Sequence, residues 1–170
     1  MSHNKNKVRW CINKAKKELN EGNKHRGLMK IESNVSEAKK HLKKAEHNFK
    51  MAINMEKFDG SDWAVSAIFY SIYHCFLAII TKFGYESRNQ DCTIALIGYL
   101  KEQDKIKLDQ DIIDELILSE HEDHHQRNTI ELRENFQYGT QTTMDDKRLK
   151  ELKNLSRKAI DQTKKIIYFE

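Results

Sequence analysis

The chain has no proline and only 6 glycines in 170 residues. These two residue types most often end helices and form tight turns, so their scarcity argues against folds built from short strands and many turns. Lysine, glutamate, leucine, isoleucine and alanine dominate instead, which favours long helices. A chain of this length can enclose a hydrophobic core without a metal or a disulfide. We therefore predict an all-α fold.

Cysteine is also rare. Cys11, Cys75 and Cys92 are odd in number, form no CxxC pair and lack the histidine spacing of a closed zinc site. A reducing cytosol, in which thiols stay free, is the natural compartment for such a pattern. The N-terminus lacks the apolar core of a signal peptide. We expect a soluble cytoplasmic protein with no cofactor and no membrane attachment.

Long hydrophobic runs are limited to one, SDWAVSAIFYSIYHCFLAIITKF, residues 61–83. Drawn as a helix, its apolar side chains cover most of the circumference, so the helix must be surrounded. Its length would permit a membrane span, but Ser66, Ser71 and His74 interrupt it and Gly84 ends it. We predict a buried central helix, in which His74 is a hydrogen-bonded core histidine rather than a catalytic base.

Other segments show apolar residues at helical spacing. One runs from about Ser33 to Phe58, with Asn34 or Ser36 as its N-cap, and the Asp59-Gly60 turn makes it an antiparallel hairpin with the central helix. Further helices are predicted to start at three later sites. These are Asp91, Asp109 and Asp145 or Asp146. The helix from Asp109 is predicted to run to about residue 136, with or without a kink, and to end at Gly139.

Together these segments predict an up-and-down bundle of four to five helices over residues 34–170. Residues 1–33 are predicted to form a basic extension, with a short amphipathic helix and then a flexible connector. Trp10 either packs onto the bundle or stacks on a nucleic-acid base. Packing is the favoured interpretation, because an exposed tryptophan is costly.

Charge is unevenly distributed along the chain. Residues 1–50 carry 14 Lys/Arg against 5 Asp/Glu, residues 51–145 carry 8 against 17, and residues 146–170 carry 8 against 4. Basic ends suit contact with phosphate groups or attraction between copies of the chain, and the sequence leaves both open. Solvated helix faces are the default interpretation.

Three histidines, His121, His124 and His125, cluster in SEHEDHHQR. His121 and His125 are four residues apart and share a helix face, with Glu122 and Asp123 close enough to assist a divalent metal. Two ligands do not define a coordination sphere, however, and the segment is hydrophilic throughout. We interpret it as a solvated acidic surface and predict no metal.

The segment LRENFQYG, residues 132–139, groups polar side chains suited to an anion. They are Arg133, Asn135, Gln137 and Tyr138. A guanidinium binds phosphate bidentately and a phenol donates a hydrogen bond to it. The residues alone favour a helix end with a locally paired arginine, and a phosphate site is the alternative.

The order of these features resembles the HEPN-domain proteins. The likeness rests on the helix containing KKAEHNFKMA, the helix WAVSAIFYSIYHCFLAIITKFGYES, the segment DCTIALIGYL and the Arg/Tyr segment before the last helix. The likeness covers nearly the whole chain from about Val8. It is a likeness to the small archaeal and bacterial members, some of which begin with a VRWC-like leader. The resemblance implies a homodimer, often encoded beside a minimal nucleotidyltransferase as a toxin–antitoxin couple.

Active HEPN members are metal-independent ribonucleases with an arginine followed, after four to six residues, by a histidine. In them the arginine binds the scissile phosphate and the histidine assists attack by the ribose hydroxyl. Here Arg133 takes the arginine position and Tyr138 stands where the histidine is expected. A tyrosine with an ordinary pKa of ~10 is a poor general base at neutral pH. By resemblance, Tyr138 instead binds nucleotide phosphate or accepts a group from the nucleotidyltransferase.

Three hypotheses follow. The first is a dimeric module without the usual catalytic histidine, which binds RNA, nucleotide or a nucleotidyltransferase through Arg133, Asn135, Gln137 and Tyr138. The second is a ribonuclease in which Tyr138 or one of the three clustered histidines replaces the missing base. The third is a structural bundle whose basic ends bind another protein.

Overall fold

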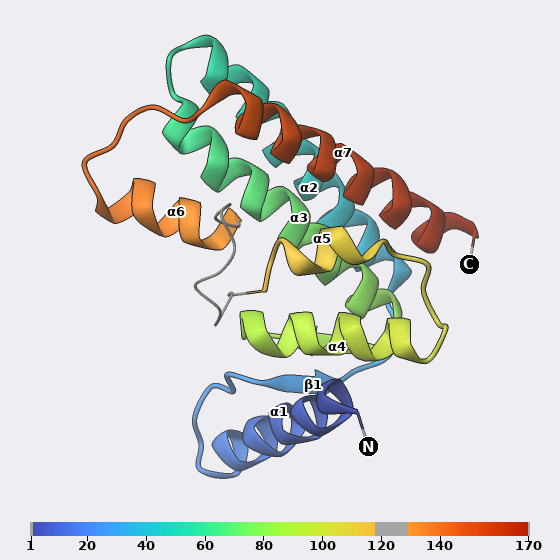
Figure 1. Cartoon of the computed structure of the whole chain (residues 1–170). Helices are drawn as coiled ribbons and strands as arrows, with labels where there is room; N and C mark the ends of the chain where they lie inside the picture. Colours follow the sequence, from blue (N-terminus) through green and yellow to red (C-terminus); the bar gives the residue numbers. More distant parts are fainter. Residues whose placement is uncertain (1, 118–128, 170) are drawn as a thin grey trace.

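The structure is a computed structural model that describes residues 2–117 and 129–169. Across these residues it contains seven helices and one two-stranded antiparallel sheet (Figure 1). The predicted all-α bundle is confirmed, with a small addition of β structure. The elements are α1 (His3–Asn20), β1 (Leu28–Lys30), α2 (Val35–Lys57), α3 (Ser61–Lys82), β2 (Tyr85–Ser87), α4 (Gln90–Glu102), α5 (Gln110–Asp114), α6 (Thr129–Tyr138) and α7 (Asp146–Phe169).

Helix α3 lies at the centre of the bundle, in contact with α2, α4, α6 and α7 (Figure 1). Ile68, Ile72, Phe76 and Ile79 are fully buried within it. By length and composition α3 is apolar enough to cross a membrane, but most of it is enclosed by the other helices, as in the core helix of a folded domain. The prediction of a buried central helix is confirmed.

Helices α2 and α3 form the predicted antiparallel hairpin. His41 contacts His74, and the Ser71 hydroxyl donates to the Ala45 carbonyl at 2.8 Å, so residue numbers rise along one helix as they fall along the other. Asn34 caps α2 by accepting a hydrogen bond from the Glu37 N–H at 2.9 Å, as predicted.

Two other helix boundaries agree with the sequence and one does not. Helix α6 ends just before Gly139, and α7 begins at Asp146. The predicted cap of α4 at Asp91 is wrong, because the Asn89 side chain accepts from the Cys92 N–H at 3.0 Å and the helix begins two residues earlier than expected. The helix predicted from Asp109 ends at Asp114, so it does not continue unbroken, and its predicted later part crosses residues 118–128, which lie outside the described residues.

Residues 2–31, here called the N-terminal module, contain α1 and β1. The predicted amphipathic helix is present and extends over 18 residues. Strand β1, where the sequence suggested a flexible connector, pairs antiparallel with β2, with Leu28 opposite Ser87. Gly27 permits α1 to lie close to the strand, because a Cβ there would come within 2.3 Å of the Cys11 carbonyl oxygen.

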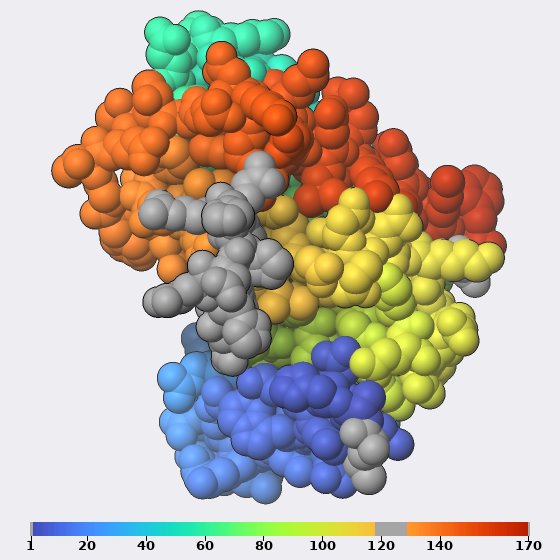
Figure 2. All heavy atoms as spheres, in the orientation of Figure 1, coloured from blue at the N-terminus to red at the C-terminus, as the bar shows by residue number. Residues whose placement is uncertain are grey.

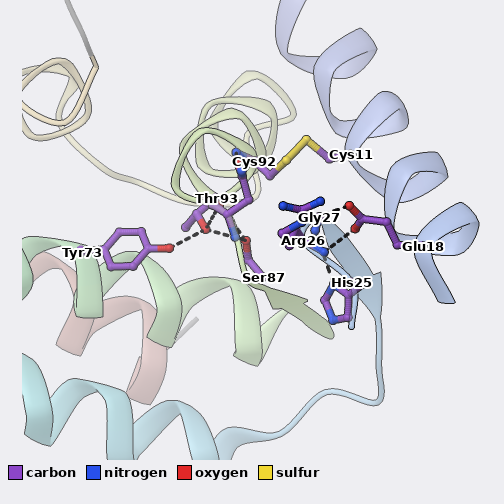
Figure 3. The surroundings of a disulfide bond; sticks show 10 residues. Cys11, Glu18, His25, Arg26, Gly27, Tyr73, Ser87, Cys92 and Thr93 are labelled. Atoms are coloured by element: carbon purple, nitrogen blue, oxygen red, sulfur yellow. Dashed lines mark hydrogen bonds and ion pairs between the residues drawn. A yellow bond between two sulfur atoms is a disulfide. The ribbon is translucent and has the colours of Figure 1, made fainter. Parts of the chain in front are cut away.

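A disulfide joins Cys11 of α1 to Cys92 of α4, with a Cα–Cα distance of 5.9 Å (Figure 3). This corrects the expectation that the thiols stay free; among the three cysteines, Cys75 is free and buried. The bond joins residues separated by 81 positions in the sequence. It does not by itself identify the compartment, since intracellular proteins of hyperthermophiles also carry disulfides.

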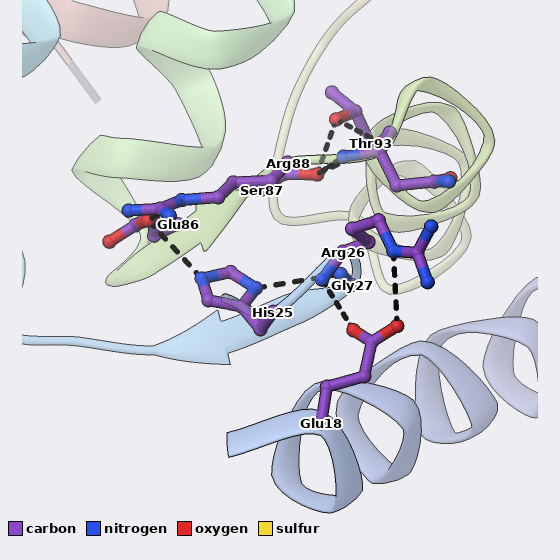
Figure 4. Close-up of polar contacts among 9 residues, drawn as sticks. Glu18, His25, Arg26, Gly27, Glu86, Ser87, Arg88 and Thr93 are labelled. Carbon is purple, nitrogen blue, oxygen red and sulfur yellow. Dashed lines mark hydrogen bonds and ion pairs between the residues drawn. The ribbon is translucent and has the colours of Figure 1, made fainter. Parts of the chain in front are cut away.

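Polar contacts order the N-terminal module and join it to β2 (Figure 4). The Arg26 N–H and Nε donate to the two carboxylate oxygens of Glu18, at 2.5 and 3.3 Å. Buried His25 lies 3.2 Å from Glu86 of β2, whose carboxylate also accepts from Arg88 Nε at 2.8 Å. The module is therefore tied to the bundle by covalent, strand and side-chain contacts.

Candidate functional site

Arg133 of α6 points toward the central helix rather than into solvent. Its guanidinium carbon lies 4.3 Å from the ring centre of Phe69 and 6.0 Å from that of Tyr70, both on α3. The side chain is only 17% exposed. Its nearest carboxylate is Glu134 at 3.8 Å, too far for a hydrogen bond, and its Nε makes no hydrogen bond to any described residue. Arg133 is thus oriented by aromatic rings, and no carboxylate of the described residues is hydrogen-bonded to its guanidinium, whose Nε is buried.

A carboxylate at the end of α5 fixes the start of α6. Glu115 accepts hydrogen bonds from both the backbone N–H and the hydroxyl of Thr129, at 2.5 and 2.6 Å. Arg148 of α7 donates to the same carboxylate at 2.9 Å. Because Thr129 is the first residue of α6, these contacts join the start of that helix to the end of α5 and to Arg148 of α7.

The other predicted site residues lie apart from the arginine side chain. Asn135, Gln137 and Tyr138 lie nearer the surface, and Tyr138, at 81%, is among the most exposed side chains described. Arg133 and Tyr138 are five positions apart on a helix and so project at different angles. No hydrogen bond or ring contact joins them within the described residues. Their joint role in one site stays a prediction.

A histidine pair that the sequence did not predict lies between α2 and α3. Nδ1 of His41 and Nδ1 of His74 are 3.1 Å apart. His74 is therefore hydrogen-bonded, as predicted, but it is half-buried rather than fully enclosed in the core. Burial lowers the pKa of His74 to about 4, helped by the nearby His41 and Lys44, and burial also lowers the pKa of His41. Both rings are therefore neutral at pH 7 and one accepts from the other. Because the two residues lie 33 positions apart, no local motif signals the pair.

Metal-binding side chains and thiols are two other sources of chemistry in a protein. Over residues 2–117 and 129–169 no group of three or more metal-binding side chains is present. His121, His124 and His125 lie outside the described residues. Burial raises the pKa of the Cys75 thiol to about 12, which keeps it protonated and chemically inert.

The architecture defines a class of protein. It is an all-α bundle with an apolar central helix, α3, and an arginine that α6 places beside it. A family model, the HEPN domain, matches residues 38–168, which is most of the chain. The chain belongs to the HEPN domain family. A search of curated proteins finds no significant match.

Membership in this family assigns the chain to a nucleotide- and RNA-related group of modules that are often toxin-like. The matched residues begin within α2 and end within α7, so they include α3, α6 and Arg133. They exclude α1 and β1. The N-terminal module is therefore an addition to the family domain, and its properties have to be inferred from its own residues.

Proposed function

We infer that the protein is a dimeric RNA- or nucleotide-binding HEPN module of a toxin–antitoxin type system, paired with a minimal nucleotidyltransferase and lacking the usual catalytic histidine. Arg133 binds phosphate, and Asn135, Gln137 and Tyr138 provide further polar contacts. The single observation that carries this proposal is the state of Arg133, a largely buried guanidinium held by aromatic rings with no carboxylate hydrogen-bonded to it among the described residues.

The aromatic environment suits phosphate binding. Partial burial strengthens a charge-assisted hydrogen bond, because water competes less for the guanidinium. The rings of Phe69 and Tyr70 restrict the side chain, so less conformational entropy is lost when the anion binds. An arginine paired firmly with a carboxylate would have to break that pair first.

Support for a homodimer comes from α3. Trp63 and Tyr70 are 62% and 46% exposed, and their seven-residue spacing places them on one face of the helix. Exposed aromatic side chains of this kind are typical of protein interfaces. Tyr70 also neighbours Arg133, so a two-fold contact through this face would bring the arginines of two copies toward one groove.

Tyr138 has a different role from Arg133. Its exposure leaves the phenol accessible both to a bound phosphate and to a nucleotidyltransferase partner. Tyr138 stands at the position where the family's histidine is expected. For this reason we propose binding rather than ribonuclease chemistry.

The test is RNA and nucleotide binding by Arg133 variants. Fluorescence anisotropy with a labelled RNA oligonucleotide should show that Arg133→Ala weakens binding by about 10- to 100-fold, the usual effect of removing a charge-assisted hydrogen bond. Arg133→Lys should recover part of the affinity, since lysine keeps the charge but not the bidentate geometry. Incubation with RNA in the presence of a chelator should leave the RNA intact.

The matched control is Arg157→Ala. Arg157 of α7 also lies over an aromatic ring, 5.5 Å from the centre of Phe49, but away from α6. It should leave binding unchanged. Equal binding by wild type and Arg133→Ala would refute the phosphate site, and cyclic-phosphate RNA products that vanish in Arg133→Ala would establish the ribonuclease instead.

A further inference from the structure

Trp10 is exposed on the outer face of α1. The sequence favoured packing against the bundle, but the ring is 53% exposed, and the side chains buried from α1 are Val8, Cys11 and Ala15. Its near neighbours are cations: Lys7 Nζ and Lys14 Nζ lie 5.0 and 5.2 Å from the ring centre. An exposed tryptophan costs solvation free energy, and here its surroundings are positively charged.

An open groove of about 770 Å³ begins at this ring. Four cations line it, Lys14, Lys17, Lys24 and Arg26, together with Asn13 and Asn23. Of its two carboxylates, Glu18 is 12% exposed and hydrogen-bonded by Arg26, whereas Glu21 is exposed and makes only a 3.9 Å contact with Lys17. Lys14 and Lys24 form no ion pair with any described residue. The groove therefore presents uncompensated positive charge beside an aromatic ring.

A second groove, of about 520 Å³, lies along α1 and shares Asn13 with the first. Its charged residues are Lys5, Arg9, Lys16 and Lys30, and its aromatic residues are Tyr85 and Tyr99. Residues 1–30 carry 9 Lys/Arg against 2 Glu. Cations and aromatic rings thus occur on both sides of α1. The N-terminal residues form one end of the molecule (Figure 2).

We propose that the outer face of α1 binds a single-stranded polynucleotide, with a base stacked on Trp10 and backbone phosphates against Lys14, Lys24 and their neighbours. Proteins that bind single strands without sequence preference combine these two features, a basic groove and exposed aromatic rings. Arginine and lysine contacts to phosphate release counterions, so binding weakens steeply with salt. Trp10, Lys14 and Lys24 lie outside the matched HEPN residues and are independent of Arg133.

The same residues do not suit a membrane surface. An interfacial helix inserts a broad apolar face, but the apolar face of α1 is occupied: Cys11 is bonded to Cys92, and Ala15 is fully buried. What remains outside is mainly lysine, arginine and asparagine around the indole of Trp10, with Leu19 as the one other large apolar residue of α1 that is exposed among the described residues. A stacked base matches this composition.

Anisotropy with fluorescein-labelled ten-nucleotide uridine RNA, its DNA counterpart and a duplex tests the proposal on the full chain with its disulfide intact. Trp10→Ala should weaken single-strand binding by about 5- to 100-fold, and Trp10→Phe should retain most of it. Lys14→Glu with Lys24→Glu should also flatten the dependence of log Kd on log salt, by about 0.7 for each phosphate that the protein no longer neutralises. Tighter binding of RNA than of DNA would identify RNA as the ligand.

Phe58→Ala is the matched control, since Phe58 is an 85% exposed aromatic residue away from α1 and should leave binding unchanged. Trp10 and Lys24 are exposed and Lys14 is partly exposed, so their variants should fold, as circular dichroism will check. Wild-type affinity in Trp10→Ala overturns the proposal, and so does binding to phosphatidylserine vesicles with none to single strands. If Arg133→Ala alone weakens RNA binding, the HEPN site stands and the α1 surface does not.

Discussion

The bundle and the N-terminal module are held together by different forces. In the bundle, apolar side chains of α3 such as Ile72 and Phe76 are fully buried among helices from the rest of the chain. The module buries few apolar residues, chiefly Val8, Cys11 and Leu28, and relies on a disulfide, strand pairing and side-chain hydrogen bonds. A unit this small cannot bury enough apolar surface to hold its position by packing alone.

The difference has a functional consequence. A helix that is anchored by a covalent bond needs only a narrow apolar face, so the remaining surface of α1 is free to carry cations and Trp10. The bundle helices must use most of their surface for packing, and α3 retains only scattered exposed aromatic residues. Three expected effects, the second measured in two ways, test this difference.

The largest effect is expected in the bundle core. Phe76→Ala removes a fully buried ring and should lower the free energy of unfolding by about 3–5 kcal/mol, because apolar burial is removed and a cavity is left behind. Urea denaturation measures this decrease. The control is Phe58→Ala, which should change the free energy by less than about 0.5 kcal/mol. Similar decreases in the two variants would show that packing around α3 does not dominate the free energy of unfolding.

The next effect concerns the disulfide. Cys11→Ser should lower the free energy of unfolding by about 2–4 kcal/mol, because the unfolded chain is no longer constrained by a long-range cross-link. Hydrogen exchange should rise in residues 3–30 and stay low in α2 and α3. A reductant should have no further effect on the variant.

Thiol counting checks the same bond directly. The denatured, unreduced wild type should react with maleimide at Cys75 alone, and reduction should add two more thiols. Three reactive thiols without reduction would contradict the cross-link and with it the account of how α1 is attached.

The smallest effect is on pH dependence, through the His41–His74 pair in the bundle. The folded pKa of His74 is about 4, below its usual 6.5, so between these values the unfolded chain takes up a proton that the folded chain does not. Stability should therefore fall as the pH drops through this window. A decrease of about 1–2 kcal/mol is expected, less than full linkage because both rings are half-exposed.

Urea titrations at pH 7.5 and pH 5 measure this decrease. His74→Phe should reduce it, because the variant has no ring nitrogen to protonate at that position. His47→Gln, on the exposed side of α2, should leave it unchanged. An identical pH dependence in His74→Phe and the wild type would show that the pair does not control acid stability.

Local signals in the sequence predicted much of the bundle and little of the module. Periodicity and capping residues placed α2, α3 and α7 well, because helices depend on neighbouring residues. The strand pairing of Leu28 with Ser87 was missed, since three residues are too few to show alternation. The disulfide was missed because cysteine partners 81 positions apart leave no local pattern.

The candidate site was likewise predicted only in part from the sequence. Arg133 and Tyr138 were identified from their residue types and spacing, whereas the aromatic contacts that orient Arg133 come from α3, more than sixty positions earlier. The exposure of Trp10 was not predicted either. A tryptophan on an amphipathic helix is usually buried, and only the position of α4 shows which face of α1 is covered.

Sequence alone determined that the chain forms helices, that residues 61–83 lie at the centre and that the N-terminus is basic, because helix propensity, hydrophobic spacing and charge are properties of adjacent residues. The tertiary structure alone decided that Cys11 meets Cys92, that Arg133 rests on aromatic rings and that Trp10 faces outward. Each of these depends on how distant helices pack, which no short stretch of sequence specifies.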